Sequence, residues 1–241
     1  MRLLLNFSTS ESLKSEIFNK YYIQSFIYST LINTEFENTH NKKGFKFFTF
    51  SDYFPSGDMD KNQIKSIIIS SPSEEFIKTI KDRLEERGFF YLHNKRLEIE
   101  SLKTYFINYI PKSVETGSPI VLYYDGKRNK YFSFRDKGTI SFFLRRLKEN
   151  AIKKYMTYYS IDEFDINEML FDSLMFKKEV AVKVTKNGID FIIIGSLWYY
   201  LNKIYINERY KRFYKFILDA GLGEKNSLGF GFLNPRKVEK L

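Results

Sequence analysis

The sequence predicts an α+β protein of two domains, each an antiparallel sheet with helices on one face. Its 241 residues fit one large or two small domains, and 43% of them are hydrophobic. The 25 phenylalanines and 18 tyrosines can fill two cores and leave rings free to stack on nucleic-acid bases. The order of the expected elements decides the class, because strands and helices alternate as β-α-β-β-α-β in the first half.

The first elements follow from their apolar spacing. Residues 2–8 form a short apolar run typical of a buried strand, and residues 19–33 place apolar side chains at helical intervals. The polar stretch 34–41 is compatible with a short helix or a loop. The aromatic run 45–54 and the isoleucine-rich run 64–71 predict the next two strands.

The second expected helix has a clear start and end. Ser73 can cap its free N–H groups, and Glu74 and Glu75 lie at its positive end. This helix ends at Gly88, and the runs 89–92 and 96–107 then predict a hairpin. The complete order is that of a ferredoxin-like unit, in which both helices cover one face of the sheet.

The second half repeats this order loosely, without an obvious sequence repeat. Turns are expected at Asp125-Gly126 and Asn187-Gly188. The expected strands are 120–124, 130–134, 180–185, 189–198 and 228–234, and the expected helices are 136–155, 163–174 and 207–220. We therefore expect tandem ferredoxin-like, or RRM-like, domains.

The domain boundary is expected at the turn-forming segment 116–119, where the charge also changes. The net charge of +10 is unevenly distributed, because residues 1–118 carry +1 and residues 119–241 carry +9. We expect an N-terminal domain over 1–117 and a basic C-terminal domain over 118–241. A positive excess of this size favours a polyanionic partner.

The composition excludes several kinds of chemistry. Cysteine is absent and only His40 and His93 are present, which excludes disulfides, thiolate metal sites and histidine-rich metal sites. Asp52, Asp58 and Asp60 are close in sequence, but the proline and glycine between them indicate a solvated loop. We therefore expect neither a metal nor a cofactor.

No membrane association is expected either. The N-terminal apolar run is too short for a signal peptide. The longest later run, 191–201, falls short of the roughly 20 residues that span a bilayer. The sequence predicts a soluble cytoplasmic protein.

Residues 221–231 contain the strongest functional motif, four glycines in G-h-G-x5-G-h-G spacing, where h is apolar. Glycine permits positive φ, and a loop with free N–H groups and Lys225 at its middle can hold phosphate oxygens. The alternative is a tight helix-to-strand turn whose glycines only pack. No Gly-Lys-Ser/Thr follows, and the glycines come after a helix, which excludes a P-loop and a dinucleotide-binding fingerprint.

The segment 223–231, Gly-Glu-Lys-Asn-Ser-Leu-Gly-Phe-Gly, resembles the C-terminal motif of the CRISPR-associated repeat-RNA endoribonucleases. These form the Cas six family of the repeat-associated mysterious protein superfamily. Segment 23–28 resembles the first helix of that family, 40–51 its His-to-strand segment, and 118–120 the start of its second domain. The resemblance implies metal-independent cleavage of CRISPR precursor RNA within its repeats. The 2′-hydroxyl would attack the adjacent phosphorus and leave a 2′,3′-cyclic phosphate and a 5′-hydroxyl.

The resemblance also implies a catalytic set of Tyr28, His40 and Lys46. A histidine with an unperturbed pKa near 6.5 can serve as general base or general acid in this reaction. A lysine stabilises the charge of the phosphorane, and a tyrosine can orient the 2′-hydroxyl or stack on a base. The assignment of acid and base stays open. Lys42 and Lys43 are alternatives to Lys46, and His93 is an alternative to His40.

A competing interpretation uses the same segment. Residues 43–50 partly fit the signature strand of an RNA-recognition module, in which Phe45 and Phe47 stack on bases and nothing is cleaved. A plain aromatic core strand is the simplest alternative. The second functional hypothesis is therefore a catalytically inactive RNA-binding subunit of the same superfamily.

The expected partner is CRISPR repeat RNA. The two basic helices at 136–155 and 207–220 are each compatible with a solvated face, but their shared charge favours an RNA track. The expected RNA contacts are Gly221, Gly223, Lys225, Asn226, Ser227, Gly229, Gly231, Arg145, Arg146, Arg209 and Arg212. A multi-subunit CRISPR effector complex and a second copy of the chain are further expected partners.

Overall fold

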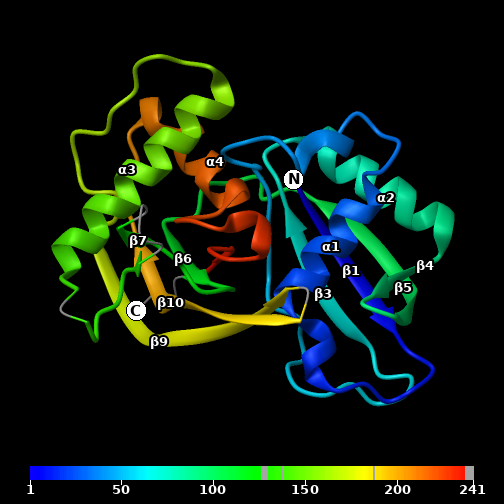
Figure 1. Cartoon of the computed structure of the whole chain (residues 1–241). Coiled ribbons are helices and arrows are strands. Elements are labelled where there is room, and N and C mark those ends of the chain that lie inside the picture. The colour runs from blue at the N-terminus through cyan, green and yellow to red at the C-terminus, as the bar shows by residue number, and fades with distance from the viewer. Residues whose placement is uncertain (126–129, 137, 187, 237–241) are drawn as a thin grey trace.

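The computed structural model describes residues 1–125, 130–136, 138–186 and 188–236. Two antiparallel sheets lie side by side, one in each half of the chain (Figure 1). This confirms the α+β class with antiparallel sheets. Gly126 and Asn187, which belong to the two expected turns of the second half, lie outside the described residues.

The first sheet has five strands in the order β2-β3-β1-β5-β4. Its strands are β1 (Arg2–Ser8), β2 (Thr49–Phe50), β3 (Lys65–Ser70), β4 (Phe89–Leu92) and β5 (Lys95–Tyr105). Helices α1 (Lys20–Thr30) and α2 (Glu74–Arg87) pack against the same face, because side chains of both share one core with β1 and β3. The expected caps of α2 are confirmed: Ser73 accepts a bond from the Phe76 N–H, and Gly88 has φ 72°.

The second sheet has four strands in the order β11-β6-β10-β9. Its strands are β6 (Ser113–Thr116), β9 (Ser173–Lys186), β10 (Ile189–Asn202) and β11 (Leu233–Pro235). Helices α3 (Ile140–Tyr159) and α4 (Lys211–Ala220) share its core, and β7 (Tyr123–Asp125) pairs with β8 (Lys130–Tyr131) as a small ribbon. Short 3₁₀ turns lie at η1 (Ser15–Phe18), η2 (Glu37–Thr39), η3 (Glu208–Tyr210) and η4 (Asn226–Leu228).

Five of the expected elements differ from the structure. The strands expected at 120–124 and 130–134 shrink to β7 and β8, which pair with each other outside the four-stranded sheet. The strand expected at 45–54 shrinks to β2, because Phe47 has φ 54° and turns its ring toward Tyr158 of the second half. The strand expected at 228–234 is only β11, because Gly229 and Gly231 have φ 77° and 71°, which breaks extended backbone.

The helix expected at 163–174 is absent. Lys203 Nζ instead bonds to the Glu168 and Asp172 carboxylates and to the Met169 carbonyl, at 2.8 to 3.0 Å. The Asp172 carboxylate also accepts the Ile204 N–H at 2.8 Å. Because these contacts come from the end of β10, they hold the segment as an irregular loop on the sheet.

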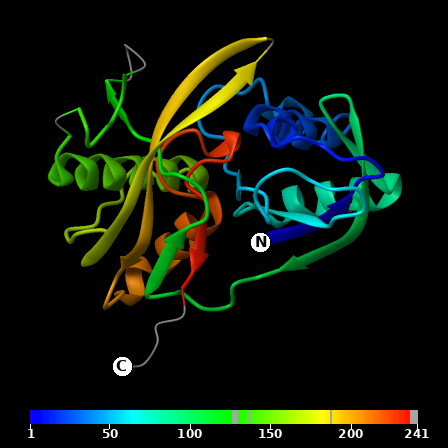
Figure 2. The same cartoon turned by 90° about the horizontal axis from the view of Figure 1, so that it is seen from below.

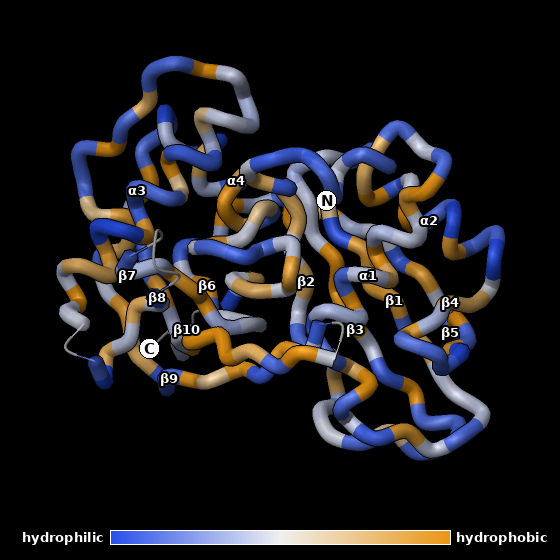
Figure 3. The backbone as a smooth tube through the Cα atoms, viewed as in Figure 1, coloured by the Kyte–Doolittle hydropathy of each residue, from blue (hydrophilic) through white to orange (hydrophobic). Residues whose placement is uncertain are grey.

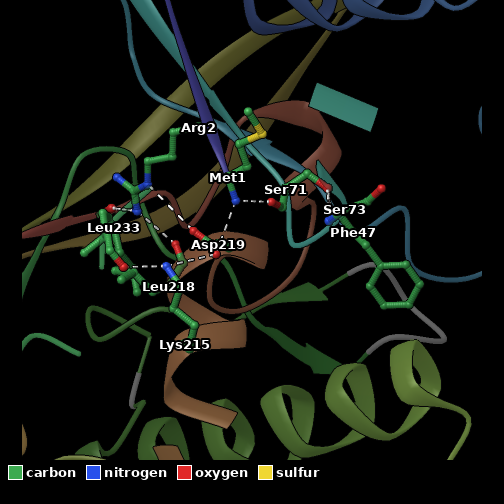
Figure 4. Close-up of polar contacts among 10 residues, drawn as sticks. Met1, Arg2, Phe47, Ser71, Ser73, Lys215, Leu218, Asp219 and Leu233 are labelled. Atoms are coloured by element: carbon green, nitrogen blue, oxygen red, sulfur yellow. Dashed lines mark hydrogen bonds and ion pairs between the residues drawn. The ribbon is translucent and has the colours of Figure 1, made fainter. Parts of the chain in front are cut away.

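The two halves are tightly connected. Arg2, at the start of β1, is 1% exposed and donates to the Leu218 and Leu233 carbonyls of the second half at 3.0 and 2.8 Å (Figure 4). In the other direction, the long β9–β10 hairpin reaches over to α1, where Lys186 Nζ lies 5.7 Å from the Tyr21 ring centre (Figure 2).

The polarity of the chain follows this arrangement. Hydrophobic residues recur along the strands of both sheets, whereas the outer side of α2 is mostly hydrophilic (Figure 3). Within the described ranges, no helix is long and apolar enough to cross a membrane.

Candidate functional site

The glycine-rich loop, residues 221–231, lies between the two halves and is held there by a buried lysine. Lys154 of α3 is 1% exposed, and its Nζ donates to Gly221 O at 2.6 Å, Gly223 O at 3.1 Å and Asn226 Oδ1 at 2.8 Å. Burial lowers the pKa of Lys154 to about 7, and the negative charge of Glu224 partly opposes this shift. The sequence placed Lys154 among the basic residues of a helix, but the structure makes it an internal support of the loop.

The four glycines of this loop are buried and have positive φ. A Cβ on Gly229 would lie 2.1 Å from the Phe50 ring, and one on Gly231 would lie 1.8 Å from Leu222 O. The N–H groups of Gly221, Gly229 and Gly231 donate to carbonyls of this chain. The expectation that free N–H groups of these three glycines hold phosphate is therefore wrong, and their role in the structure is close packing.

One face of α1 contacts the loop. Lys20, Gln24 and Tyr28 are spaced four residues apart, which puts them on one stripe of the helix. Lys20 Nζ donates to Gly229 O at 2.7 Å, and Gln24 Nε2 donates to Ser227 O at 2.9 Å. Tyr28 shares a side-chain hydrogen bond with Ser227. Gln24 was not anticipated, although its spacing from Tyr28 was visible in the sequence.

Tyr28 and His40 meet at the end of this stripe. Their ring centres are 4.8 Å apart and the planes are nearly perpendicular, at 88°. Burial raises the pKa of the Tyr28 hydroxyl, and its hydrogen bond with Ser227 opposes that shift. His40 is exposed directly after η2, with Nδ1 3.2 Å from Asn41 Oδ1. An acceptor at Nδ1 favours the proton on that nitrogen and leaves Nε2 open to a ligand.

Lys46 lies in the segment that leads from His40 into β2. Its Nζ is buried and has no hydrogen-bond partner among the described residues. Burial lowers the pKa of Lys46, and the nearby positive charge of Lys42 lowers it further. A buried ammonium without an acceptor is costly, and an anionic ligand would relieve that cost. Lys42 and Lys43 are exposed.

His93 is separate from this group. Its ring stacks on Tyr22 with centres 4.7 Å apart, on the hairpin between β4 and β5. Tyr22 lies two residues from both Lys20 and Gln24, about half a helical turn, so it faces another direction than the Lys20–Gln24–Tyr28 stripe. The structure thus brings Tyr28 together with His40 and leaves His93 elsewhere.

The expected arginine contacts divide into two groups. Arg145 and Arg146, near the start of α3, both lie beside Glu149, at 4.0 and 2.9 Å. Arg212 is exposed over the Tyr159 ring at 3.8 Å, next to the aromatic contact between Tyr158 and Phe47.

The other residues expected to contact RNA differ in how far their side chains are exposed to solvent. Arg209 lies over its neighbour Tyr210 at 4.4 Å. In the glycine-rich loop, Lys225 and Ser227 are half-buried, whereas Asn226 is buried and bonds inside the loop. Contact of any of these residues with RNA stays a prediction.

Comparison with known proteins agrees with this architecture. A family model described as CRISPR associated protein Cas6, C-terminal, matches residues 103–235. The chain is 43% identical to CRISPR-associated endoribonuclease Cas6 2 of Methanocaldococcus jannaschii over 243 aligned residues, which cover 98% of this chain and 100% of that protein.

Solved structures show the same fold. One described as CRISPR associated protein Cas6 matches with a TM-score of 0.72 and 25% identity, over 98% of this chain and 99% of the other. A second, described as a RAMP protein binding different RNA substrates, matches with a TM-score of 0.70 and 18% identity, over 98% and 100%. The shared fold and the matching family model define the class, a CRISPR-associated α+β protein. Within it, the chain belongs to the Cas6 family of endoribonucleases.

Proposed function

We propose that this enzyme cleaves CRISPR precursor RNA within its repeats, without a metal, by attack of the 2′-hydroxyl on the adjacent phosphorus. The products would carry a 2′,3′-cyclic phosphate and a 5′-hydroxyl. One observation supports this most directly. Tyr28 and His40 are in edge contact beside Ser227 of the glycine-rich loop. The segment that follows His40 carries the ammonium of Lys46, which has no hydrogen-bond partner in the part of the chain that the structure describes.

The three side chains supply the groups that the reaction needs. His40 Nε2, open to solvent, accepts the proton of the 2′-hydroxyl or donates one to the leaving 5′-oxygen. The Lys46 ammonium stabilises the extra negative charge of the phosphorane, which also gives this cation the acceptor that it lacks. The Tyr28 hydroxyl orients the 2′-hydroxyl from its fixed place against Ser227.

We also propose that both halves are ferredoxin-like units. The division expected near residue 117 then lies before β6 (Ser113–Thr116), because this strand pairs with β10 and β11 of the second sheet. In such a unit each helix connects two strands that have a third strand between them. The elements β6, α3, β9, β10, α4 and β11 follow in that order, and β6 lies between β10 and β11 in the sheet. The first half is analogous, with β1 between β3 and β5. Repetition of one topology supports a duplicated unit.

The alternative is a subunit that binds repeat RNA without cutting it. The basic second half and the exposed Arg212 suit this role as well as cleavage. The edge contact of Tyr28 with His40 and the unpartnered Lys46 favour the enzyme, because simple binding does not need a histidine poised in this way.

A cleavage assay separates the two. Labelled repeat RNA is incubated in excess EDTA with the unmodified protein, with His40→Ala and with His93→Ala as the matched control. A second substrate carries a 2′-deoxy sugar at the cleavage position. We expect one cut by the unmodified protein and by His93→Ala, and none by His40→Ala or on the deoxy substrate. A gel shift without any cut, with or without added metal, would overturn the nuclease proposal and leave RNA binding.

A further inference from the structure

The backbone at Phe47 is held in an unusual conformation just beside Lys46. Phe47 has φ 54°, a value that residues other than glycine, asparagine and aspartate rarely adopt. Such a conformation persists only where the surroundings determine it, and it is often found beside functional groups. The contacts that hold Phe47 therefore also determine where Lys46 lies.

Contacts from both halves of the chain hold Phe47. Its ring lies 5.0 Å from Tyr158 and 6.4 Å from Phe216, both in the second half. Its carbonyl accepts a hydrogen bond of 2.8 Å from the Ser71 hydroxyl, in the first half (Figure 4). The next side chain, Phe48, turns back into the first core, where it stacks on Phe76.

The Ser71 hydroxyl is itself oriented. The N–H of Ser73 donates to Ser71 Oγ at 3.1 Å, so that the hydroxyl proton points to Phe47 O. The backbone of Ser71 pairs with Met1 in both directions, at 3.1 and 2.8 Å, and the residue is 2% exposed. Ser71 is thus a rigid donor at the junction of β3 and α2.

We propose that Ser71 is a positioning residue for the active site: its hydroxyl fixes the Phe47 carbonyl, and this directs the Lys46 ammonium toward the scissile phosphate. The inference rests on the cleavage function proposed above. Because Ser71 is 2% exposed, this role places it out of contact with the RNA and the reacting atoms. Without its bond, Phe47 relaxes toward ordinary negative φ, and the preceding Lys46 changes direction.

The neighbouring residue supplies a matched control. Ser70 is 0% exposed, and its hydroxyl has no hydrogen-bond partner among the described residues. Ser70→Ala therefore removes a buried hydroxyl of the same size from the adjacent position without breaking a bond. Ser71→Thr keeps a hydroxyl and serves as the rescue variant, and Ser71→Cys keeps the size but is a weak donor.

The test measures single-turnover cleavage against pH, together with the RNA dissociation constant and the melting temperature of each variant. We expect Ser71→Ala to lower the cleavage rate about 10- to 100-fold, as small misplacements of reacting groups do. RNA affinity stays nearly unchanged, Ser70→Ala cleaves like the unmodified protein, and Ser71→Thr recovers most of the rate. If Ser71→Ala does not fold, Ser71→Cys carries the same comparison.

The pH profile and a double variant separate positioning from a general loss of structure. Lys46 must be protonated to stabilise the phosphorane, so the rate falls as pH rises through its pKa. Burial and Lys42 lower the pKa of Lys46, so release of its side chain moves that alkaline limb to higher pH. In a Lys46→Ala background, Ser71→Ala should have no further effect on cleavage.

Three results overturn the proposal, and they are distinguishable. If the unmodified protein cleaves and Ser71→Ala and Ser71→Cys behave like Ser70→Ala, the positioning role is wrong and the cleavage function stands. If Ser71→Ala is still harmful when Lys46 is alanine, Ser71 acts through something other than Lys46. If the unmodified protein binds RNA and never cuts, the cleavage function fails first, and the positioning role fails with it.

Discussion

At the scale of single residues, the hydrogen bonds of Lys154 to the glycine-rich loop make the stability of the fold depend on the protonation of this side chain. Three acceptors surround its Nζ, and each of them belongs to the glycine-rich loop. An ammonium has three N–H donors and satisfies all three, whereas a neutral amine has only two. Burial nevertheless lowers the pKa of this group to about 7.

The shift predicts a pH dependence with a definite sign. Between pH about 7 and the ordinary value of 10.5, the unfolded chain holds a proton on Lys154 that the folded protein has lost. The free energy of unfolding therefore rises with pH in this window, by at most about 1.4 kcal/mol per pH unit, and is independent of this group below it.

Urea unfolding at pH 7, 8 and 9 measures this contribution of Lys154. It is the difference in the free energy of unfolding between the unmodified protein and Lys154→Met at each pH. We expect the unmodified protein to gain stability relative to the variant as pH rises. The window stops at pH 9 because other groups, such as the tyrosines, ionise above it. If the free energies of unfolding of the two proteins change in parallel with pH, Lys154 keeps an ordinary pKa in the folded protein.

At the scale of elements, α1 is the structural link between the glycine-rich loop and the histidine segment. Its stripe of Lys20, Gln24 and Tyr28 makes three consecutive contacts along the loop and ends against His40. The neighbouring face of α1, with Ile23, Phe26 and Ile27, is buried in the first core. Packing of α1 in the first core therefore fixes where its other side chains hold the loop.

We predict that Gln24→Ala loosens this link. The variant leaves Ser227 O without its side-chain donor, which costs about 1 kcal/mol of stability and allows Ser227 to move away from Tyr28. Thermal unfolding should show a small decrease in melting temperature, and single-turnover cleavage should slow. Ser25→Ala, one position along on an exposed site, is the control and should change neither quantity. Equal behaviour of the two variants would contradict a role for the stripe.

At the scale of the whole molecule, the charge of +10 belongs almost entirely to the second half, but its arginines are not equivalent. Arg145 and Arg146 face the carboxylate of Glu149 at the start of α3. Arg212 lies over Tyr159 at the other end of that helix, beside the aromatic contact of Phe47. At 1.5 Å per residue, these ends are roughly 20 Å apart.

We predict that Arg212→Ala weakens RNA binding more than Arg145→Ala. If Arg212 neutralises one phosphate, its loss lowers the slope of log affinity against log salt by about 0.7 for a single strand. Filter binding over a salt series measures both slopes, with repeat RNA and the His40→Ala protein so that cleavage does not interfere. A larger effect of Arg145→Ala would place the RNA track along the start of α3 instead.

The sequence by itself determined the features that depend on neighbouring residues. The α+β class, the caps of α2, the β9–β10 hairpin and the glycine motif follow from local spacing, helix signals and turn residues. The resemblance to the Cas six family came from short motifs of the same local kind, and the comparisons show that family membership is right.

Only the tertiary structure decided what these features do. Thr49 bonds to Phe230 O, and Lys154 bonds to Gly221 O, across 181 and 67 residues of sequence. Such contacts between residues that are distant in sequence shortened the strand expected at 45–54, and they buried Lys154, which the sequence placed on a basic helix. They also gave the glycines a packing role, and they left the Lys46 ammonium without a hydrogen-bond partner among the residues that the structure describes. Local propensity has no term for a neighbour that is distant in the sequence, and here such neighbours decide both burial and hydrogen bonding.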